Sequence, residues 1–208
     1  MKTKILTIIL FCASVVTVAQ DRYQGSHPNR VSVGINIIDD TFTKTHKLVD
    51  ATAQWNATIF PSKLSYERWI STNFSVEASI SANKYKEGKL IDGAINQKDL
   101  SYFAFDINAK YDLNDFINNK IIQIDYVFDP YLIGGLGLTD VGSFQTYTTV
   151  NYGFGTNLWF GSESWNFGNS TNFIDNIGIF VQVQGKSSFV QKKFGNEIQY
   201  SAGLIYRF

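Results

Sequence analysis

Residues 102–113, Tyr-Phe-Ala-Phe-Asp-Ile-Asn-Ala-Lys-Tyr-Asp-Leu, alternate between two kinds of side chain. The apolar set is Phe103, Phe105, Ile107, Ala109, Tyr111 and Leu113, and the other set is Tyr102, Ala104, Asp106, Asn108, Lys110 and Asp112. Because successive side chains of a β-strand point to opposite faces, a period of two predicts a strand with one apolar face. The segment exceeds the usual strand length of about 5–6 residues and reaches the roughly 9–11 that cross a bilayer at a tilt.

The same alternation recurs over 74–83, 150–160, 177–184 and 198–208. We expect eight strands, near residues 30–38, 62–70, 73–85, 100–113, 126–138, 145–160, 175–189 and 196–208. Alternating strands of this number and length predict an all-β fold, an eight-stranded antiparallel up-and-down β-barrel.

The composition favours a barrel that spans a membrane. Aromatic residues make up 15% of the chain and charged residues only 17%, whereas an average soluble domain has about 25% charged residues. The residues at alternate positions of a strand share one face and are here called a parity. The apolar parity is rich in aromatic residues, which favour membrane interfaces, and the polar parity is rich in Gly, Ser, Asn and Gln. We therefore predict a transmembrane β-barrel with its apolar face toward lipid. Parity alone does not say which face is inside, so a soluble lipocalin-like barrel with an apolar ligand cavity is the alternative.

The N-terminal residues have the pattern of a secretory signal. Lys2 and Lys4 precede the apolar run 5–11, and Thr17 and Ala19 are small residues of the kind that a signal peptidase requires. The apolar run is shorter than the roughly 18 residues that span a bilayer, which disfavours a membrane anchor. We expect a signal peptide over 1–19 and an outer-membrane β-barrel domain over 20–208.

The single cysteine, Cys12, lies within the expected signal peptide, and the bulky Phe11 before it disfavours a lipoprotein site. The mature chain would then have neither disulfides nor thiolate chemistry. Removing Lys2 and Lys4 leaves 16 basic residues against 18 acidic ones, a net charge of −2. This balance gives no reason to expect a nucleic-acid partner.

Four stretches of the sequence resemble a known family. They are Leu64-Ser-Tyr-Glu-Arg-Trp69 running into Asn73-Phe-Ser-Val-Glu77, Asp129-Pro-Tyr-Leu132 before Gly134-Gly135, Gly185-Lys-Ser-Ser-Phe189, and Gln199-Tyr-Ser-Ala-Gly-Leu-Ile-Tyr-Arg-Phe208. Together they resemble the OmpA/OmpX-like small outer-membrane barrels, especially the stand-alone OmpA-type barrels of Bacteroidota. The resemblance covers the whole mature chain. The sequence has no counterpart of the periplasmic domain with which OmpA binds peptidoglycan, so cell-wall anchoring is not expected.

The resemblance implies that the last strand is the signal read by the barrel-insertion machinery. In this family the chain ends on an aromatic residue with hydrophobic residues at alternate positions before it. The matching residues here are Tyr200, Leu204, Tyr206 and Phe208, with Ala202 between them. The final strand must also pair with the first, since lipid cannot satisfy a free backbone edge.

We expect the barrel to lie in the cell outer membrane. Because the number of strands is even, both the N- and the C-terminus would then face the periplasm. The connections near 39–61, 86–99, 139–144 and 190–195 would then face outside, and those near 71–72, 114–125 and 161–174 would face the periplasm. An eight-stranded barrel is just wide enough for its own side chains to fill. Because enclosed charges must be paired or hydrated, we predict a lumen charge network. Its members are Glu67, Glu77, Asp106, Lys110 and Arg207.

The sequence gives little support for catalysis. His27 and His46 lie away from any candidate nucleophile, and no metal-ligand spacing appears, so we expect no enzyme activity, cofactor or metal. Asp39-Asp40 could bind calcium but fits a solvated loop better. The glycine-rich stretch Gly134-Gly135-Leu-Gly137 fits a β-strand with small residues better than it fits a phosphate-binding loop.

Three functions are compatible with these features. The first is a structural role in the envelope, or as an accessory subunit of a larger outer-membrane protein complex, with membrane lipid as the surrounding partner. The second is a narrow gated channel for ions or small solutes. The third is adhesion or ligand binding through the outer loops, which hold Trp55, Lys84, Tyr85, Lys86 and Lys89. The fold does not choose among them, because function lies in sites grafted onto it.

Overall fold

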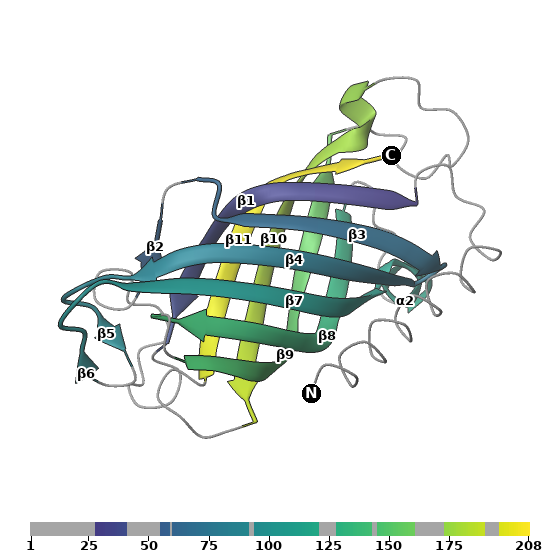
Figure 1. Ribbon diagram of the computed structural model, residues 1–208. Helices are drawn as coiled ribbons and strands as arrows, with labels where there is room; N and C mark the ends of the chain where they lie inside the picture. The colour runs from purple at the N-terminus through teal and green to yellow at the C-terminus, as the bar shows by residue number, and fades with distance from the viewer. Residues whose placement is uncertain are drawn as a thin grey trace, which may run out of the picture.

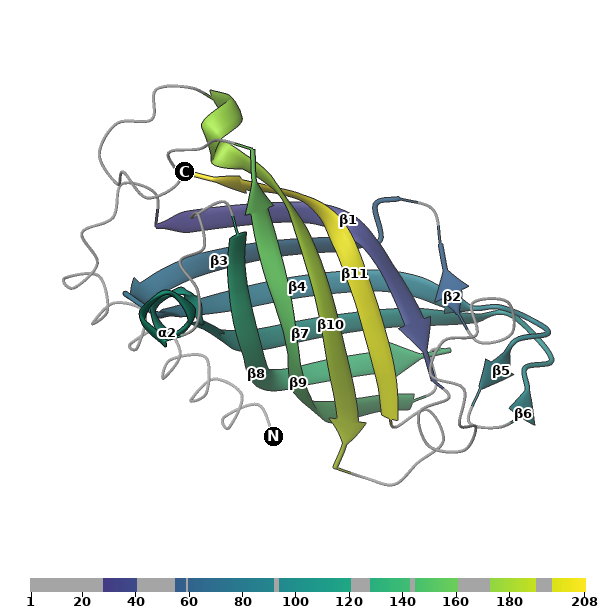
Figure 2. The same cartoon turned by 180° about the vertical axis from the view of Figure 1, so that it is seen from behind.

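Eight long antiparallel strands close into a barrel in the computed structural model (Figure 1, Figure 2). The structure describes residues 28–40, 55–58, 60–91, 94–120, 128–142, 145–160, 173–189 and 196–208. The barrel strands are β1 (Asn29–Asp39), β3 (Lys63–Ser71), β4 (Phe74–Tyr85), β7 (Leu100–Asp112), β8 (Phe128–Val141), β9 (Gln145–Trp159), β10 (Ile177–Ser188) and β11 (Asn196–Arg207). Each pairs with its neighbour in the chain, and β1 also pairs with β11, so the sheet has no free edge between them. The predicted up-and-down barrel is confirmed.

All eight predicted strands are present, with ends that differ from the prediction by a few residues. Three short strands were not predicted: β2 (Asn56–Ala57), which pairs with the end of β1, and the hairpin of β5 (Leu90–Ile91) and β6 (Ala94–Ile95). Two-residue strands are too short to show a period of two, so alternation could not indicate them.

The burial pattern decides between the membrane barrel and the soluble alternative. On β7, Phe103 and Ile107 are 49% and 42% exposed, whereas Asp106 is 2% exposed. The apolar parity therefore points outward and the polar parity points into the lumen, as in a barrel surrounded by lipid. The soluble barrel with an apolar cavity is wrong. None of the helices in the described ranges is long and apolar enough to cross a membrane.

The two ends of the barrel differ. At one end, here called the terminal rim, Asn29 and Phe208 exchange two backbone hydrogen bonds of 3.1 and 2.9 Å. The helix α2 (Asn114–Lys120) and the short helix η2 (Phe173–Asn176) lie at this same end (Figure 1, Figure 2). The predicted long turn 114–125 thus begins with a helix. The opposite end, the loop rim, has the strand ends Asp39, Tyr85 and Val141.

Apolar side chains enter the lumen mainly near its ends. The cluster near the loop rim consists of Ile38, Tyr85, Ile91, Tyr102, Ala104, Val141 and Tyr147. The cluster toward the terminal rim consists of Trp159, Phe180 and Ile205. Phe180 lies over Gly34, where an added Cβ would come within 2.9 Å of its Cζ atom, so the glycine makes room for the ring. Between the two clusters most of the buried side chains are polar, with Tyr131 and Ile133 of β8 as apolar exceptions.

Candidate functional site: the lumen network

The centre of the polar lumen is Lys110 on β7. Its Nζ atom lies 2.7 Å from Oε2 of Glu67 and 2.6 Å from Oε2 of Glu77. The two glutamates face each other across β3 and β4, so their charges would repel without a cation between them. Lys110 also lies 4.5 Å from the ring centre of Tyr131. All three charged side chains are buried, and each charge is compensated as burial requires.

Toward the terminal rim the network continues through Arg30 on β1. The Nη1 atom of Arg30 donates to Glu67 at 3.3 Å, and its Nη2 atom lies 3.5 Å from Asp129. The guanidinium lies between the indole rings of Trp69 and Trp159, at 4.7 and 5.2 Å from their centres. Cation–π contacts and ion pairs together fix this side chain in the narrow lumen.

Asp129 joins the network to the helix at the terminal rim. The Trp159 indole Nε1 atom donates to its Oδ2 atom at 2.5 Å, and the Asn114 side chain donates to its Oδ1 atom at 3.0 Å. Arg207 lies beside them, 4.6 Å from the Trp159 ring centre, and donates through Nε to Asn176 at 3.2 Å. Arginine and tryptophan side chains therefore occupy the lumen at this end.

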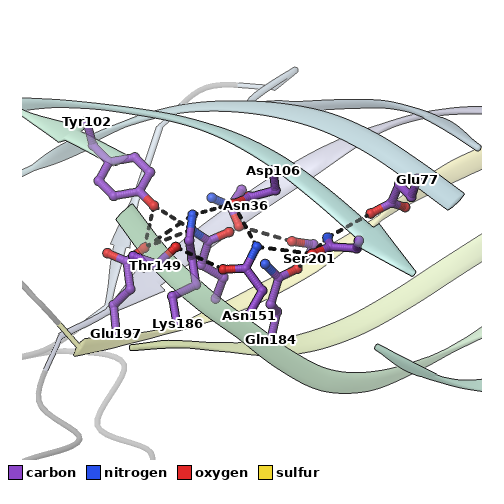
Figure 3. Close-up of polar contacts among 12 residues, drawn as sticks. Asn36, Glu77, Tyr102, Asp106, Thr149, Asn151, Gln184, Lys186, Glu197 and Ser201 are labelled. Atoms are coloured by element: carbon purple, nitrogen blue, oxygen red, sulfur yellow. Dashed lines mark hydrogen bonds and ion pairs between the residues drawn. The ribbon is translucent and has the colours of Figure 1, made fainter. Parts of the chain in front are cut away.

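A chain of amides joins Glu77 to Asp106 in the middle of the barrel (Figure 3). Asn108 donates to Glu77 at 3.5 Å, and Asn151 donates to Asn108 at 3.0 Å and to Asp106 at 2.9 Å. Gly137 faces this chain, and a Cβ added there would collide with Oδ1 of Asp106. The glycines of 134–137 thus lie in strand β8, as predicted, and Gly137 leaves space for the network.

Near the loop rim the network ends at Glu197 on β11 (Figure 3). Lys186 lies 2.8 Å from Asp106 and 4.0 Å from Glu197. Glu197 accepts hydrogen bonds from the hydroxyl groups of Tyr102 and of Tyr85, the latter at 2.9 Å. The two tyrosines therefore connect the polar lumen to the apolar cluster at the loop rim, because their hydroxyl groups bond to Glu197 and their rings belong to the cluster.

The five residues proposed for the lumen network are all buried on the inner face. Glu67, Glu77 and Lys110 are in direct contact, and Asp106 is connected to them through two asparagines. Arg207 lies at the terminal rim against Trp159 and Asn176. The sequence interpretation missed four buried charged residues that belong to the network: Arg30, Asp129, Lys186 and Glu197. The alternation of the sequence could have indicated their burial. Lys186, for example, lies on the same face of its strand as Gln182 and Gln184.

The residues of the proposed insertion signal lie on the outer face of β11. Leu204 is 51% exposed, and Phe208 stacks on Tyr206 with ring centres 6.1 Å apart. Tyr200 contacts Trp55, at 5.3 Å between ring centres. Recognition of this strand by an insertion machinery stays a prediction.

One of the proposed loop contacts was wrong. Tyr85 is fully buried and points into the barrel toward Glu197, because it lies on the inner parity of β4. Lys84 and Lys86 are exposed and line an open cavity at the loop rim. Adhesion through these loops would therefore use the lysines and not Tyr85.

The other candidate sites have less support from the structure. Asp39 and Asp40 are buried, not solvated as expected. No group of three or more His, Cys, Asp and Glu side chains that could hold a metal occurs among the described residues. His27 and His46 lie outside the described ranges, as does the expected signal peptide 1–19.

The fold is similar to those of two solved outer-membrane barrels. Neisserial surface protein A has a TM-score of 0.52 at 12% identity, and the match covers 88% of this chain and 97% of that one. The outer membrane protein OprG from Pseudomonas aeruginosa has a TM-score of 0.52 at 11% identity, with the same coverage. No protein-family model and no curated protein sequence matches the chain. At these identities the likeness concerns the fold alone, which is that of the small outer-membrane barrels.

Proposed function

We propose that this protein is an integral outer-membrane barrel with a closed lumen, serving a structural role in the envelope or as an accessory subunit of a larger outer-membrane complex. The observation that carries the proposal is the continuous polar network inside the barrel. It runs from Glu197 near the loop rim through Lys110 to Asp129 near the terminal rim. Side chains that are buried and bonded to one another obstruct the diffusion of solutes.

The outer surface supports the membrane part of the proposal. Apolar side chains point outward along the strands, as the partly exposed Leu136 and Phe154 illustrate. Within this proposal, residues 1–19 direct export, the barrel-insertion machinery recognises Tyr200 to Phe208, and both termini are periplasmic. Membership of the Bacteroidota-type stand-alone barrels is proposed on the sequence resemblance alone, and no catalytic step is assigned.

Planar bilayer recordings combined with copurification test this function. We expect reconstituted protein, folded by the criterion of a mobility shift on boiling, to give no single-channel conductance. We also expect envelope proteins to copurify with it, or a deletion strain to become sensitive to detergent. Steady conductance would contradict the closed lumen. A deletion strain with normal detergent resistance, together with no copurifying protein, would contradict both structural roles.

A narrow ion path is a second candidate, favoured by Lys63. This side chain is only 3% exposed, and no carboxylate among the described residues lies within ion-pair distance of it. Ser81, directly opposite Lys63 in the sheet, has a buried hydroxyl without a hydrogen-bond partner in the described residues, as does Thr139. A hydroxyl such as that of Ser81, unused within the described ranges and opposite a buried cation, can replace part of the water shell of a passing anion. If the wild type conducts, the variant Lys63→Met should lower the anion current.

A further inference from the structure

A shallow apolar groove of about 690 Å³ lies on the outside of the barrel, across β1 and the strands on both sides of it. Its floor is formed by Val31 and Val33, which point toward lipid. Figure 1 shows β1 between β3 and β11, with η2 beyond β11. The groove therefore lies across the seam where the first and last strands close the barrel.

Side-chain size explains the groove. In the paired strands, Val31 has a tyrosine on each side, Tyr206 on β11 and Tyr66 on β3. Val33 has a leucine on each side, Leu204 and Leu64. Because the small valines lie between larger side chains, the surface is hollow at β1, and the groove continues over β3 to Ala78 on β4 and Phe105 on β7. Phe173 of η2 extends one wall by packing on Tyr206, at 5.4 Å between ring centres.

A cation lies at the terminal end of this groove. The next outward pair in the same register is Asn29 on β1 and Arg68 on β3. Oδ1 of Asn29 accepts hydrogen bonds from the Tyr66 hydroxyl at 2.8 Å and from the Arg68 guanidinium at 3.5 Å. Within the described ranges no carboxylate pairs with Arg68. The guanidinium is thus held beside Tyr66 with most of its donors unused.

We propose that the groove and Arg68 form a binding site for one glycerophospholipid. An acyl chain lies over Val31 and Val33, and the headgroup phosphate accepts hydrogen bonds from Arg68. The planar guanidinium matches phosphate geometry and charge, and the tyrosine hydroxyl beside it suits the membrane interface. The proposal rests on the barrel being embedded in a bilayer, where such lipids surround this face.

An acyl chain fits this groove better than a second copy of the barrel does. The groove runs from Ile177 on β10 across β1 and β3 to Phe105 on β7, a course that an extended acyl chain can follow. A neighbouring barrel would present a convex surface, which would touch the larger side chains beside the groove and leave the valines of its floor uncovered. A phospholipid also supplies the anion that matches Arg68, so charge and shape favour the same occupant.

Native mass spectrometry of the full-length protein, reconstituted with vesicles of phosphatidylethanolamine and phosphatidylglycerol and then extracted in mild detergent, tests the site. The wild type should retain one phospholipid per barrel. Arg68→Gln should lower the retained fraction about tenfold, because it removes a charge-assisted contact with phosphate. Val33→Phe should displace the lipid by filling the groove. Lys84→Gln, which removes an exposed cation at the loop rim, is the matched control and should retain lipid like the wild type.

Each variant is first checked for a mobility shift on boiling, so that loss of lipid is not confused with loss of the barrel. A wild type that inserts but retains no phospholipid overturns the site and leaves the proposed function intact. Equal losses in Arg68→Gln and Lys84→Gln, unchanged binding in Val33→Phe, or a dimer in place of the lipid-bound species would also overturn it. A wild type that does not insert into vesicles contradicts the proposed function and the lipid site together.

Discussion

Phe105 and Asp106 are neighbours in β7, yet Phe105 is 39% exposed toward lipid and Asp106 is 2% exposed in the lumen. The outer face needs side chains that are apolar and of suitable size, and it makes few specific contacts. The inner face needs particular partners, because each buried charge without its counterpart is costly. The comparison teaches that sensitivity to substitution should depend on parity more than on position along the strand.

The largest effect is expected at the centre of the lumen. Lys110→Met leaves Glu77 buried without an ion-pair partner among the described residues and beside Glu67, which keeps only Arg30, because both carboxylates lie within 2.7 Å of the lysine Nζ atom. We expect the free energy of unfolding to fall by about 3–5 kcal/mol. Urea unfolding in lipid vesicles, followed by tryptophan fluorescence, measures this change.

The matched control for Lys110→Met is Lys84→Met, at an exposed position of β4. It should change stability by no more than about 0.5 kcal/mol. Adding Glu77→Gln to Lys110→Met should restore part of the loss, because the carboxylate that lost its ion-pair partner is then neutral. Equal losses at Lys110 and Lys84 would mean that the lumen network does not hold the barrel together.

A smaller effect is expected for a charge placed on the outer face. Ile107 lies near the middle of β7 and points outward, and Ile107→Lys should cost about 2–4 kcal/mol in a bilayer. Tyr111, on the same face near the terminal rim, is the matched position, and Tyr111→Lys should cost about 0–1 kcal/mol. The same unfolding assay measures both, and equal costs would contradict the placement of β7 across the membrane.

Alternation predicted the eight barrel strands and divided the residues of each strand between two faces, but it did not predict the partners. Asp106 contacts Lys186 across the lumen, from β7 to β10, and these strands are not adjacent in the sheet. Such a contact depends on the stagger of all the strands between them, which parity does not contain. The partners of Arg30 could not be predicted for the same reason, since closure of the barrel brings it to Glu67 and Asp129.

The lipid groove could not be predicted from any single segment either. Val31 and Val33 are ordinary strand residues in sequence. They form a hollow only because β11 and β3 place two tyrosines and two leucines on either side of them. Tyr85 is the last residue of β4 and lies on the same face as Ser81 and Asn83, so alternation indicated its burial, and assigning it to an outer loop was the error.

The smallest effect is expected at a neighbouring pair near the loop rim, where Tyr102 points inward and Phe103 outward. Tyr102→Phe keeps the ring but removes one hydroxyl donor to Glu197, which still accepts from Tyr85, so we expect a loss of about 1–2 kcal/mol. Phe103→Tyr adds a hydroxyl on the outer face at a level where tyrosine suits the interface, and it should change stability by at most about 0.5 kcal/mol. Urea unfolding measures the stability of both variants, one of which removes a hydroxyl group while the other adds one at the adjacent position. A larger loss of stability for Phe103→Tyr than for Tyr102→Phe would contradict this expectation. It would mean that, at this end of the barrel, inward-facing positions are not more sensitive to substitution than outward-facing ones.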